Sequence, residues 1–220
     1  NTGANYSVDQ TPDVVAKIGF DPGWGHYEAF GLFRTFHDMT GTNGVYHNNV
    51  VVGGGGGVGT VFPIVKDKLT FRGTFMAGQG IGRYGAAGLP DIAFEPNGDI
   101  LPLMEIAATA GLNWNIAPTW DAYIYGGIEK VYQENEANGF GWGSKSVTGN
   151  TTCGTANCQT SSIWQITPGI WKGIYKGNYG NMSVGAQYSL TRRNTFEDNN
   201  GVDPHAYQNV VMTSFRYSPF

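Results

Sequence analysis

Hydrophobic and polar residues alternate along most of the chain. In the segment 103–115, the even-numbered positions from Met104 to Trp114 are apolar, whereas the odd-numbered positions, beginning with Glu105, are polar or small. Side chains of a β-strand point alternately to opposite faces, so this period of two predicts a strand with one apolar and one polar face. The pattern predicts nine strands, over residues 14–20, 26–37, 57–65, 68–77, 103–115, 119–130, 163–176, 181–193 and 207–217.

The strand over 26–37 is less regular than the others. Phe30 and Leu32 share a parity with Glu28 and Arg34, which predicts either a bulge or a face of mixed character.

The predicted strands are long, and the connections between them are of two kinds. Strands of globular proteins have about 5–6 residues, whereas a membrane-spanning strand needs about 9–11. Most of the predicted strands reach the membrane-spanning length. Short turns alternate with long loops, and this sorting is typical of an outer-membrane barrel with periplasmic turns and external loops. The predicted long external loops cover about 38–56, 81–100, 133–162 and 194–206.

The strand count bears on how the sheet closes. If the C-terminal end is periplasmic, the alternation of direction puts every short turn on the periplasmic side and residues 1–11 outside. A bacterial single-chain barrel normally has an even number of strands, and an open sheet would leave two unpaired edges in lipid. Either one strand escapes the pattern, or the chain is the C-terminal part of a larger barrel, which is the preferred interpretation.

Composition agrees with a β protein. The 220 residues include 34 Gly, and 14% are aromatic. Gly costs about 1 kcal/mol at each helical position, which argues against a helical protein. No segment approaches the roughly 20 apolar residues of a transmembrane helix. The net charge of −4 and the absence of basic runs give no reason to expect nucleic acid. The chain has no initiator Met or signal peptide, which fits a mature form or a fragment.

The two cysteines, Cys153 and Cys158, lie close together in the polar segment GNTTCGTANCQT. They are either unrelated thiols or a disulfide that pins the loop. The disulfide is preferred and would indicate an oxidising compartment.

The C-terminal segment YQNVVMTSFRYSPF, residues 207–220, resembles the last strand of outer-membrane porins and related barrels. In that family the last strand usually ends in an aromatic residue, most often Phe, and serves as an assembly signal. The resemblance gives this role to Phe220. Pro219 departs from a regular strand, because Pro cannot donate to the ladder, so the last residues are expected to bend.

The resemblance implies an all-β, antiparallel transmembrane β-barrel in the outer membrane of a Gram-negative bacterium. It implies a porin-like channel for passive diffusion of small hydrophilic solutes or ions. The implied partners are the lipid bilayer with lipopolysaccharide, the barrel-assembly machinery, and either a homo-oligomer such as a trimer or a partner chain that closes the barrel. No enzymatic activity, cofactor or metal is expected.

Nine charged residues of the predicted strands share the polar parity. In a bilayer this face must look into the barrel, because an Arg facing lipid at the midplane costs about 2–4 kcal/mol. Charges of both signs would make the lumen wet and bias which ions pass, unless they pair and plug a narrow barrel. The predicted pore-lining residues are Lys17, Glu28, Arg34, Arg72, Glu105, Asp121, Glu129, Arg193 and Arg216.

Aromatic residues lie beside the predicted periplasmic turns. Trp and Tyr favour membrane–water interfaces because their rings are amphipathic, although ordinary β propensity would also place them in strands. The predicted interface aromatics are Trp24, Trp114, Trp120, Tyr179 and Tyr217.

Two glycine-rich motifs do not carry the chemistry that their spacing suggests. Residues 80–85 fit G-x-G-x-x-G, but no helical pattern follows, as a dinucleotide site would require. Residues 53–57 lack the Gly-Lys pair of a phosphate loop, and a flexible loop that enters a strand is expected there. The four His residues are scattered, and no catalytic triad can be assembled.

Two other functions remain open. A structural barrel could bind a partner through its external loops, with Phe140, Trp142 and the cysteines of 133–162 as the contact surface. Alternatively, a soluble β-sandwich or lipocalin-like binding protein would turn the apolar parity inward.

Overall fold

The computed structural model describes residues 9–42, 45–135, 141–143, 152–153, 156–157, 159–197 and 201–219, and these are almost entirely β. One large antiparallel sheet contains nine strands. They are β1 (Val14–Phe20), β2 (His26–Thr42), β3 (Val45–Val65), β4 (Leu69–Gln79), β7 (Met104–Ala117), β8 (Trp120–Val131), β13 (Thr160–Gly177), β14 (Gly180–Thr195) and β15 (His205–Ser218). The connections hold the 3-10 helix η1 (Gly82–Tyr84) and the short strands β5 (Ile92–Phe94), β6 (Ile100–Pro102), β9 (Glu134–Asn135), β10 (Gly141–Trp142), β11 (Thr152–Cys153) and β12 (Ala156–Asn157).

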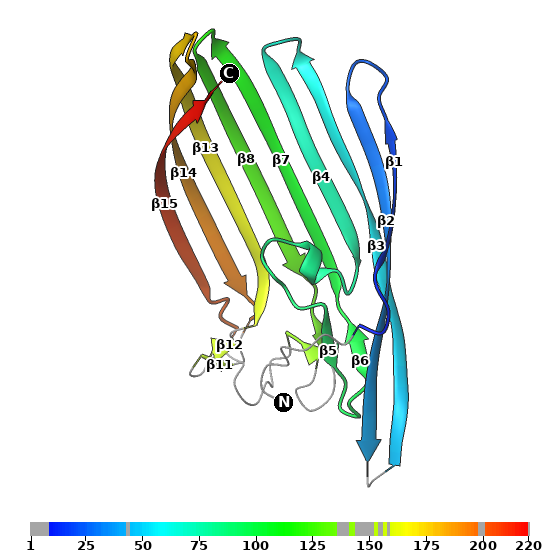
Figure 1. The fold of residues 1–220 in the computed structure, drawn as a ribbon. Coiled ribbons are helices and arrows are strands. Elements are labelled where there is room, and N and C mark those ends of the chain that lie inside the picture. Colours follow the sequence, from blue (N-terminus) through cyan, green and yellow to red (C-terminus); the bar gives the residue numbers. More distant parts are fainter. Residues whose placement is uncertain are drawn as a thin grey trace.

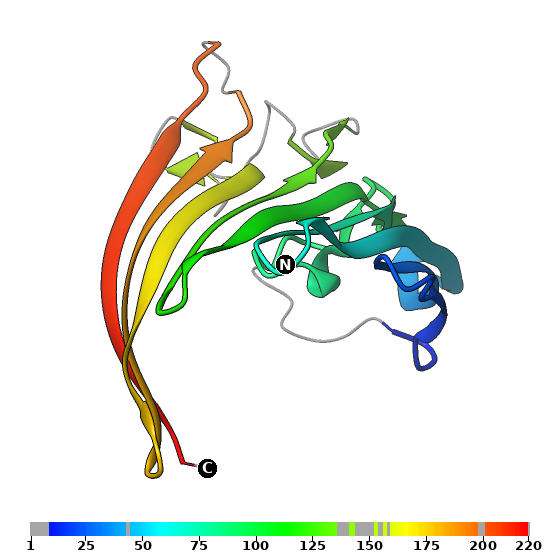
Figure 2. The same cartoon turned by 90° about the horizontal axis from the view of Figure 1, so that it is seen from above.

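The nine strands form a meander in which each strand pairs with its neighbours along the chain. The short turns after β1, β3, β7 and β13 all lie at one end of the sheet, which is the top in Figure 1. The long connections lie at the other end. We call these the turn end and the loop end. Seen from above, the sheet bends into an open trough (Figure 2).

The nine predicted strands are confirmed, and so are the four short connections and three of the four long ones. The mixed face predicted for 26–37 is confirmed too, because β2 pairs with both neighbours in regular register without a bulge. Phe30 and Leu32 therefore lie on the same face of the sheet as Glu28 and Arg34.

The prediction of a loop over 38–56 is wrong, because β2 and β3 continue through nearly all of it. The glycines at 53–57 belong to β3 and not to a flexible loop. A Cβ at Gly57 would collide with the ring of Phe30, and one at Gly53 with the ring of Phe36. Both aromatic rings belong to the paired strand β2. Glycine is needed here because large rings of one strand lie flat over the next.

Strand pairing defines two faces of the sheet. On the convex face lie the apolar positions, such as Ile18, Phe75, Ile124 and Val211, and each is 42–75% exposed. On the other face, which lines the trough, lie the charged positions that the sequence places on the opposite parity. We call this the concave face. The sheet is thus amphipathic, with its apolar side uncovered.

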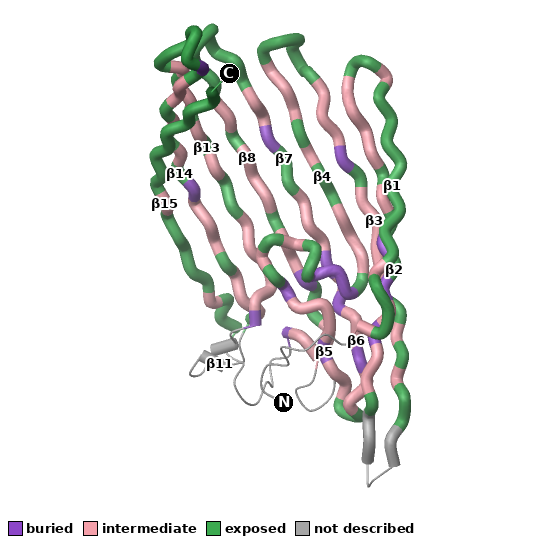
Figure 3. The backbone as a smooth tube through the Cα atoms, viewed as in Figure 1, coloured by how far each residue is buried: buried purple, intermediate pink, exposed green. Residues whose placement is uncertain are grey.

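A second layer covers the concave face only. In the connection between β4 and β7, residues 80–103, the part around η1 folds back over the inside of the trough, and β5 and β6 lie at the loop end, where β6 contacts β3 (Figures 1 and 2). The long connection predicted over 81–100 is thus confirmed, and its external placement stays a prediction. Most buried residues gather where this segment meets the sheet, including Ile81, Leu103 and Val131 (Figure 3). We call residues 80–103 the inner loop.

The sheet is open. Within the described residues, β1 pairs only with β2, and β15 pairs only with β14. Both edge strands point toward the turn end (Figure 1). No helix in the described part of the chain is long and apolar enough to span a membrane.

Candidate functional site

All nine charged residues predicted to line a pore lie on the concave face. The strand registers connect them across the whole sheet: Lys17 pairs with Phe30, and Glu129 pairs with both Ala107 and Ile163. Ile163 of β13 pairs with Arg193 of β14, and Ser183 of β14 pairs with Arg216 of β15. The alternating pattern therefore continues across the sheet from β1 to β15, with these nine charged side chains on one side.

Arg34 is the centre of a buried ionic cluster on this face. Its side chain is 0% exposed, and its guanidinium lies 3.1 Å from Asp9 Oδ1, 3.1 Å from Asp13 Oδ2 and 3.0 Å from Asp91 Oδ2. Arg34 also donates to the carbonyl oxygen of Gly80. A buried guanidinium requires such neutralisation, because removal of its partners would leave an uncompensated charge. The cluster joins β2, the segment before β1, and the inner loop.

Two residues of the inner loop complete the cluster. Arg83 contacts Asp9 Oδ2 at 2.5 Å and Asp91 Oδ2 at 2.9 Å. Tyr84 donates to Asp13 Oδ2 at 2.6 Å. Partial burial and this hydrogen bond raise the pKa of the Tyr84 phenol above its ordinary value, so the phenol keeps its proton and remains a donor. Two guanidinium groups thus share three carboxylates.

Glu129 holds the inner loop at a second point. Its Oε1 accepts a hydrogen bond from the backbone N–H of Ala86 at 2.7 Å, and its Oε2 accepts one from Ala87 at 2.9 Å. Gly85 permits this approach, because a Cβ there would collide with the Glu129 carboxylate. Gly82 similarly lies against Glu105, which is buried at 3% exposure. Glycines of the loop therefore let its backbone reach the acidic side chains of the sheet.

The inner loop leaves space between itself and the sheet. A cavity of ≈ 620 Å³ lies between Tyr84–Ala87 and the wall formed by β4, β7, β8 and β13. Toward the turn end, a second space of ≈ 360 Å³ is lined by Asp121, Tyr123 and Arg216. Arg216 lies over the Trp171 ring, 4.6 Å from its centroid. The trough therefore stays hollow under the inner loop and toward the turn end.

The nine predicted residues play different parts in this arrangement. Arg34, Glu105 and Glu129 are covered by the inner loop or bind it. Lys17 and Glu28 pair with each other at 2.8 Å near the turn end. Arg193 donates to Thr160 Oγ1 at 2.8 Å. Arg72 and Arg216 form no salt bridge with the described residues, so both carry unneutralised charge on the concave face.

The five predicted interface aromatics lie together at the turn end. All are exposed: Tyr179 at 74%, Trp24 at 61% and Trp120 at 36% mark the range. Trp24 stacks at a tilt on Tyr27, with ring centroids 4.9 Å apart. The remaining two, Trp114 and Tyr217, belong to the ends of β7 and β15 nearest the turns.

Sequence reasoning missed the ionic cluster around Arg34. The pair Asp9 and Asp13, Arg34 itself and Asp91 come from three distant parts of the chain, and no local pattern brings them together. The one local signal is the glycine-rich motif at 80–85. Its glycines turn the chain inward, with Gly80 at a φ of 70°, and present Arg83 and Tyr84 to the cluster.

Some sequence predictions concern residues outside the described part of the chain. Cys158, Phe140 and Phe220 are among them, so the proposed disulfide and the terminal assembly signal lie outside the described residues. Trp142 is described, and it packs inward: it donates to the Thr160 carbonyl oxygen at 3.1 Å and lies against the Leu89–Leu103–Val131 cluster. Within the described ranges, no three His, Cys, Asp or Glu side chains are arranged to hold a metal ion.

Comparison of the chain with protein-family models, curated proteins and solved structures finds no match.

Proposed function

We propose that this chain forms part of the wall of a porin-like channel in a bacterial outer membrane. The observation that carries the proposal is the placement of the second layer: the inner loop covers the polar, concave face and leaves the apolar, convex face open. A water-soluble protein would cover the apolar face of its sheet. Side chains such as Val211, at 75%, and Phe215, at 63%, are instead left exposed on that face.

This arrangement argues against a soluble β-sandwich. Burial of a Val, Ile or Phe side chain stabilises a protein in water by about 1.5–3 kcal/mol. The convex face leaves such side chains uncovered on every strand from β1 to β15. In a bilayer the same face meets hydrocarbon, and the strands of 11 to 21 residues from β2 to β15 are long enough to cross it.

The proposal requires further strands to close the barrel. Nine antiparallel strands leave β1 and β15 running in the same direction, so the two edges cannot form an antiparallel pair directly. An odd number of additional strands would restore the alternation. They belong to a longer form of this chain or to a partner chain. Unpaired edges in lipid would leave N–H and C=O groups without partners, at several kcal/mol each.

Within such a barrel, the inner loop narrows the passage. Arg34, Arg83 and Glu129 fix it against the wall, and open space remains between the loop and the sheet and toward the turn end. Solutes would therefore pass a restricted region lined by the loop and by the opposite wall. The packing of Trp142 against this side of the molecule leaves less support for a role in binding partners through 133–162.

Planar-bilayer recordings test the proposal. The assembled barrel is expected to give stepwise ion conductance when added to a bilayer of neutral lipid. Heat-denatured protein from the same preparation is the control and should give none. A correctly folded preparation that produces no steps above baseline would contradict the channel.

A further inference from the structure

The convex face carries an unusual distribution of charge. Every carboxylate of the nine strands lies on the concave face, including Glu28, Glu105 and Glu129. By register, three cations point outward on the convex face, namely Lys130, Lys172 and Arg192. The outward surface of the described strands is therefore purely cationic wherever it is charged.

Each outward cation lies over an aromatic ring and lacks a carboxylate partner among the described residues. Lys130 Nζ is 4.7 Å from the Tyr132 centroid, and the guanidinium of Arg192 is 5.3 Å from that of Tyr207. Arg192 Nε is buried and makes no hydrogen bond within the described structure. Cation–π contacts lower the cost of such charges without neutralising them, so an external anion would be complementary to this surface.

Lys130 and Arg192 lie near each other at the loop end. Trp164 of β13 pairs in register with both Ile128 and Arg192, and Ser162 pairs with Lys130. The two cations thus lie two strands apart and two residues apart along the strands, which together correspond to about 12 Å between their backbones. Between them, Asn194 Nδ2 donates to Ser162 Oγ at 2.9 Å. The result is a polar, cationic patch on an otherwise apolar surface.

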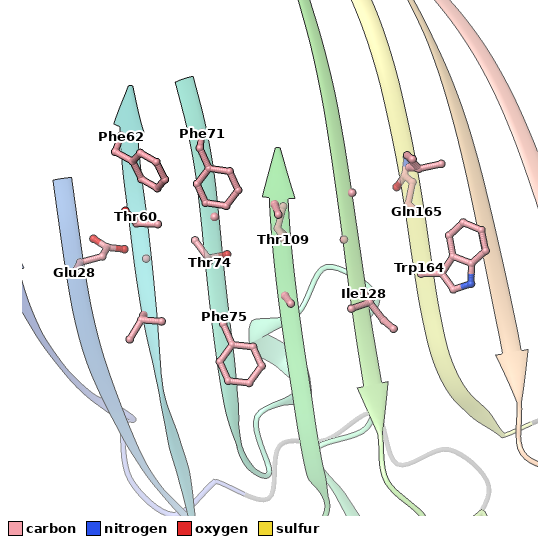
Figure 4. Close-up of a pocket in the computed structure, with 18 of the residues that line it drawn as sticks. Glu28, Thr60, Phe62, Phe71, Thr74, Phe75, Thr109, Ile128, Trp164 and Gln165 are labelled. Carbon is pink, nitrogen blue, oxygen red and sulfur yellow. The ribbon is translucent and has the colours of Figure 1, made fainter. Parts of the chain in front are cut away.

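An apolar groove of ≈ 870 Å³ begins beside this patch and crosses the convex face (Figure 4). Its floor is formed by small side chains, including Ala108, Ala110 and Gly126. Phe71 and Phe75 flank it on β4, and Trp164 flanks it on β13. Small residues between large ones leave an apolar groove in the surface. Trp164 belongs both to this groove and to the cationic patch.

We propose that this patch and groove bind the lipid A part of lipopolysaccharide, with phosphate at Lys130 and Arg192 and an acyl chain in the groove. The assignment rests on the proposed function. In an outer-membrane barrel the short turns are periplasmic, so the loop end would lie at the outer leaflet, where lipopolysaccharide is the anionic lipid. The two cations lie about 12 Å apart at their backbones, and their long side chains can reach two phosphates of one headgroup. Hydrogen bonds between such cations and phosphate are charge-assisted, and the acyl chain is held by its apolar contacts.

Native mass spectrometry of the assembled barrel in detergent tests the proposal. Purified bis-phosphorylated lipid A is titrated, and the fraction of protein with one bound lipid is measured. The double variant Lys130→Ala/Arg192→Ala is expected to bind at least about tenfold more weakly, because loss of even one charge-assisted contact corresponds to about this factor. Ala110→Trp, which fills the groove and keeps both cations, is expected to weaken binding as well.

Lys172→Ala is the matched control, because Lys172 is an outward cation at the turn end, over the Trp120 ring at 4.9 Å. Its affinity for lipid A should stay within about twofold of the wild type, which is less than the tenfold change that 1.4 kcal/mol produces. Equal binding of lipid A by the wild type and the double variant would overturn the proposal. Binding of phosphatidylglycerol as tight as that of lipid A would also overturn it, by showing a general anionic-lipid surface.

Conductance of the same preparations separates this inference from the proposed function. The variants change outward side chains only, so they are expected to conduct like the wild type. Conductance without lipid A binding would overturn the lipid site and leave the channel intact. Lipid A binding that depends on Lys130 and Arg192, in a protein without conductance, would overturn the channel and support the lipid site.

Discussion

At the scale of single residues, glycine has two separate uses in this chain. In β3 it makes room for aromatic rings of β2, as Gly57 does for Phe30. In the inner loop it lets the backbone approach the sheet, as Gly82 does beside Glu105 and the Leu89 carbonyl oxygen. Both uses require the absence of a Cβ, and neither requires flexibility. High glycine content therefore accompanies close packing here.

Gly82→Ala tests this account of the loop glycines. A Cβ at position 82 would collide with the Leu89 carbonyl oxygen, so the variant is expected to lower the free energy of unfolding by about 1–3 kcal/mol. Urea titration of the assembled barrel in lipid vesicles, followed by tryptophan fluorescence, would measure it.

Gly31→Ala is the control for that measurement, because nothing lies within 4 Å of a Cβ at position 31. It should change the same free energy by less than about 0.5 kcal/mol. Equal effects of the two substitutions would show that close approach is not what glycine provides at position 82.

At the scale of elements, the strands were predictable from sequence and the inner loop was not. The nine strands follow from alternation, which is a local pattern, and the charged parity follows with them. The inner loop is held by Arg34, Asp9 and Asp91, which come from three distant segments. Such contacts have no period in the sequence. The prediction for the β2–β3 region was wrong for another reason. A run of Gly indicates a loop unless the aromatic rings that cover it are known.

Glu129→Ala tests how the inner loop is fixed. The substitution removes the acceptor for the N–H groups of Ala86 and Ala87, each a hydrogen bond to a charged group worth about 1.5–3 kcal/mol. Backbone amides of 82–88 are expected to exchange with solvent faster, and single-channel conductance is expected to rise because the narrow region loosens.

Glu28→Ala removes the same charge from the same face without touching the loop, since Glu28 contacts Lys17 and His26. Its exchange pattern over 82–88 should match that of the wild type. Unchanged exchange in Glu129→Ala would contradict the role assigned to this carboxylate.

At the scale of the whole molecule, the concave face combines a neutralised region under the loop with free charges elsewhere. Arg72 and Arg216 form no salt bridge with the described residues, and both lie away from the Arg34 cluster, toward the turn end. Charged rings in a channel bias which ions pass. The selectivity of the proposed channel should therefore depend on these two residues more than on the buried Arg34, whose charge is shared with three carboxylates.

Arg72→Gln/Arg216→Gln is expected to shift the channel toward cations. Removal of two positive charges from a concave face that keeps Asp121 makes the local potential more negative. The reversal potential in a salt gradient across a planar bilayer measures the shift. Arg192→Gln is the control and should leave the reversal potential unchanged, because its side chain points outward. An unchanged selectivity in the double variant would contradict the lumenal placement of Arg72 and Arg216.

The most direct test of the central claim compares two adjacent residues of β7. Thr109 points to the concave face and Ala110 to the convex groove. Each is replaced by Cys in a chain whose native cysteines, Cys153 and Cys158, are changed to Ser. A membrane-impermeant cationic thiol reagent is then applied to the barrel in intact bilayers. The account predicts labelling at position 109 and none at position 110. Equal labelling at both positions would contradict a wall with one face in water and the other in lipid.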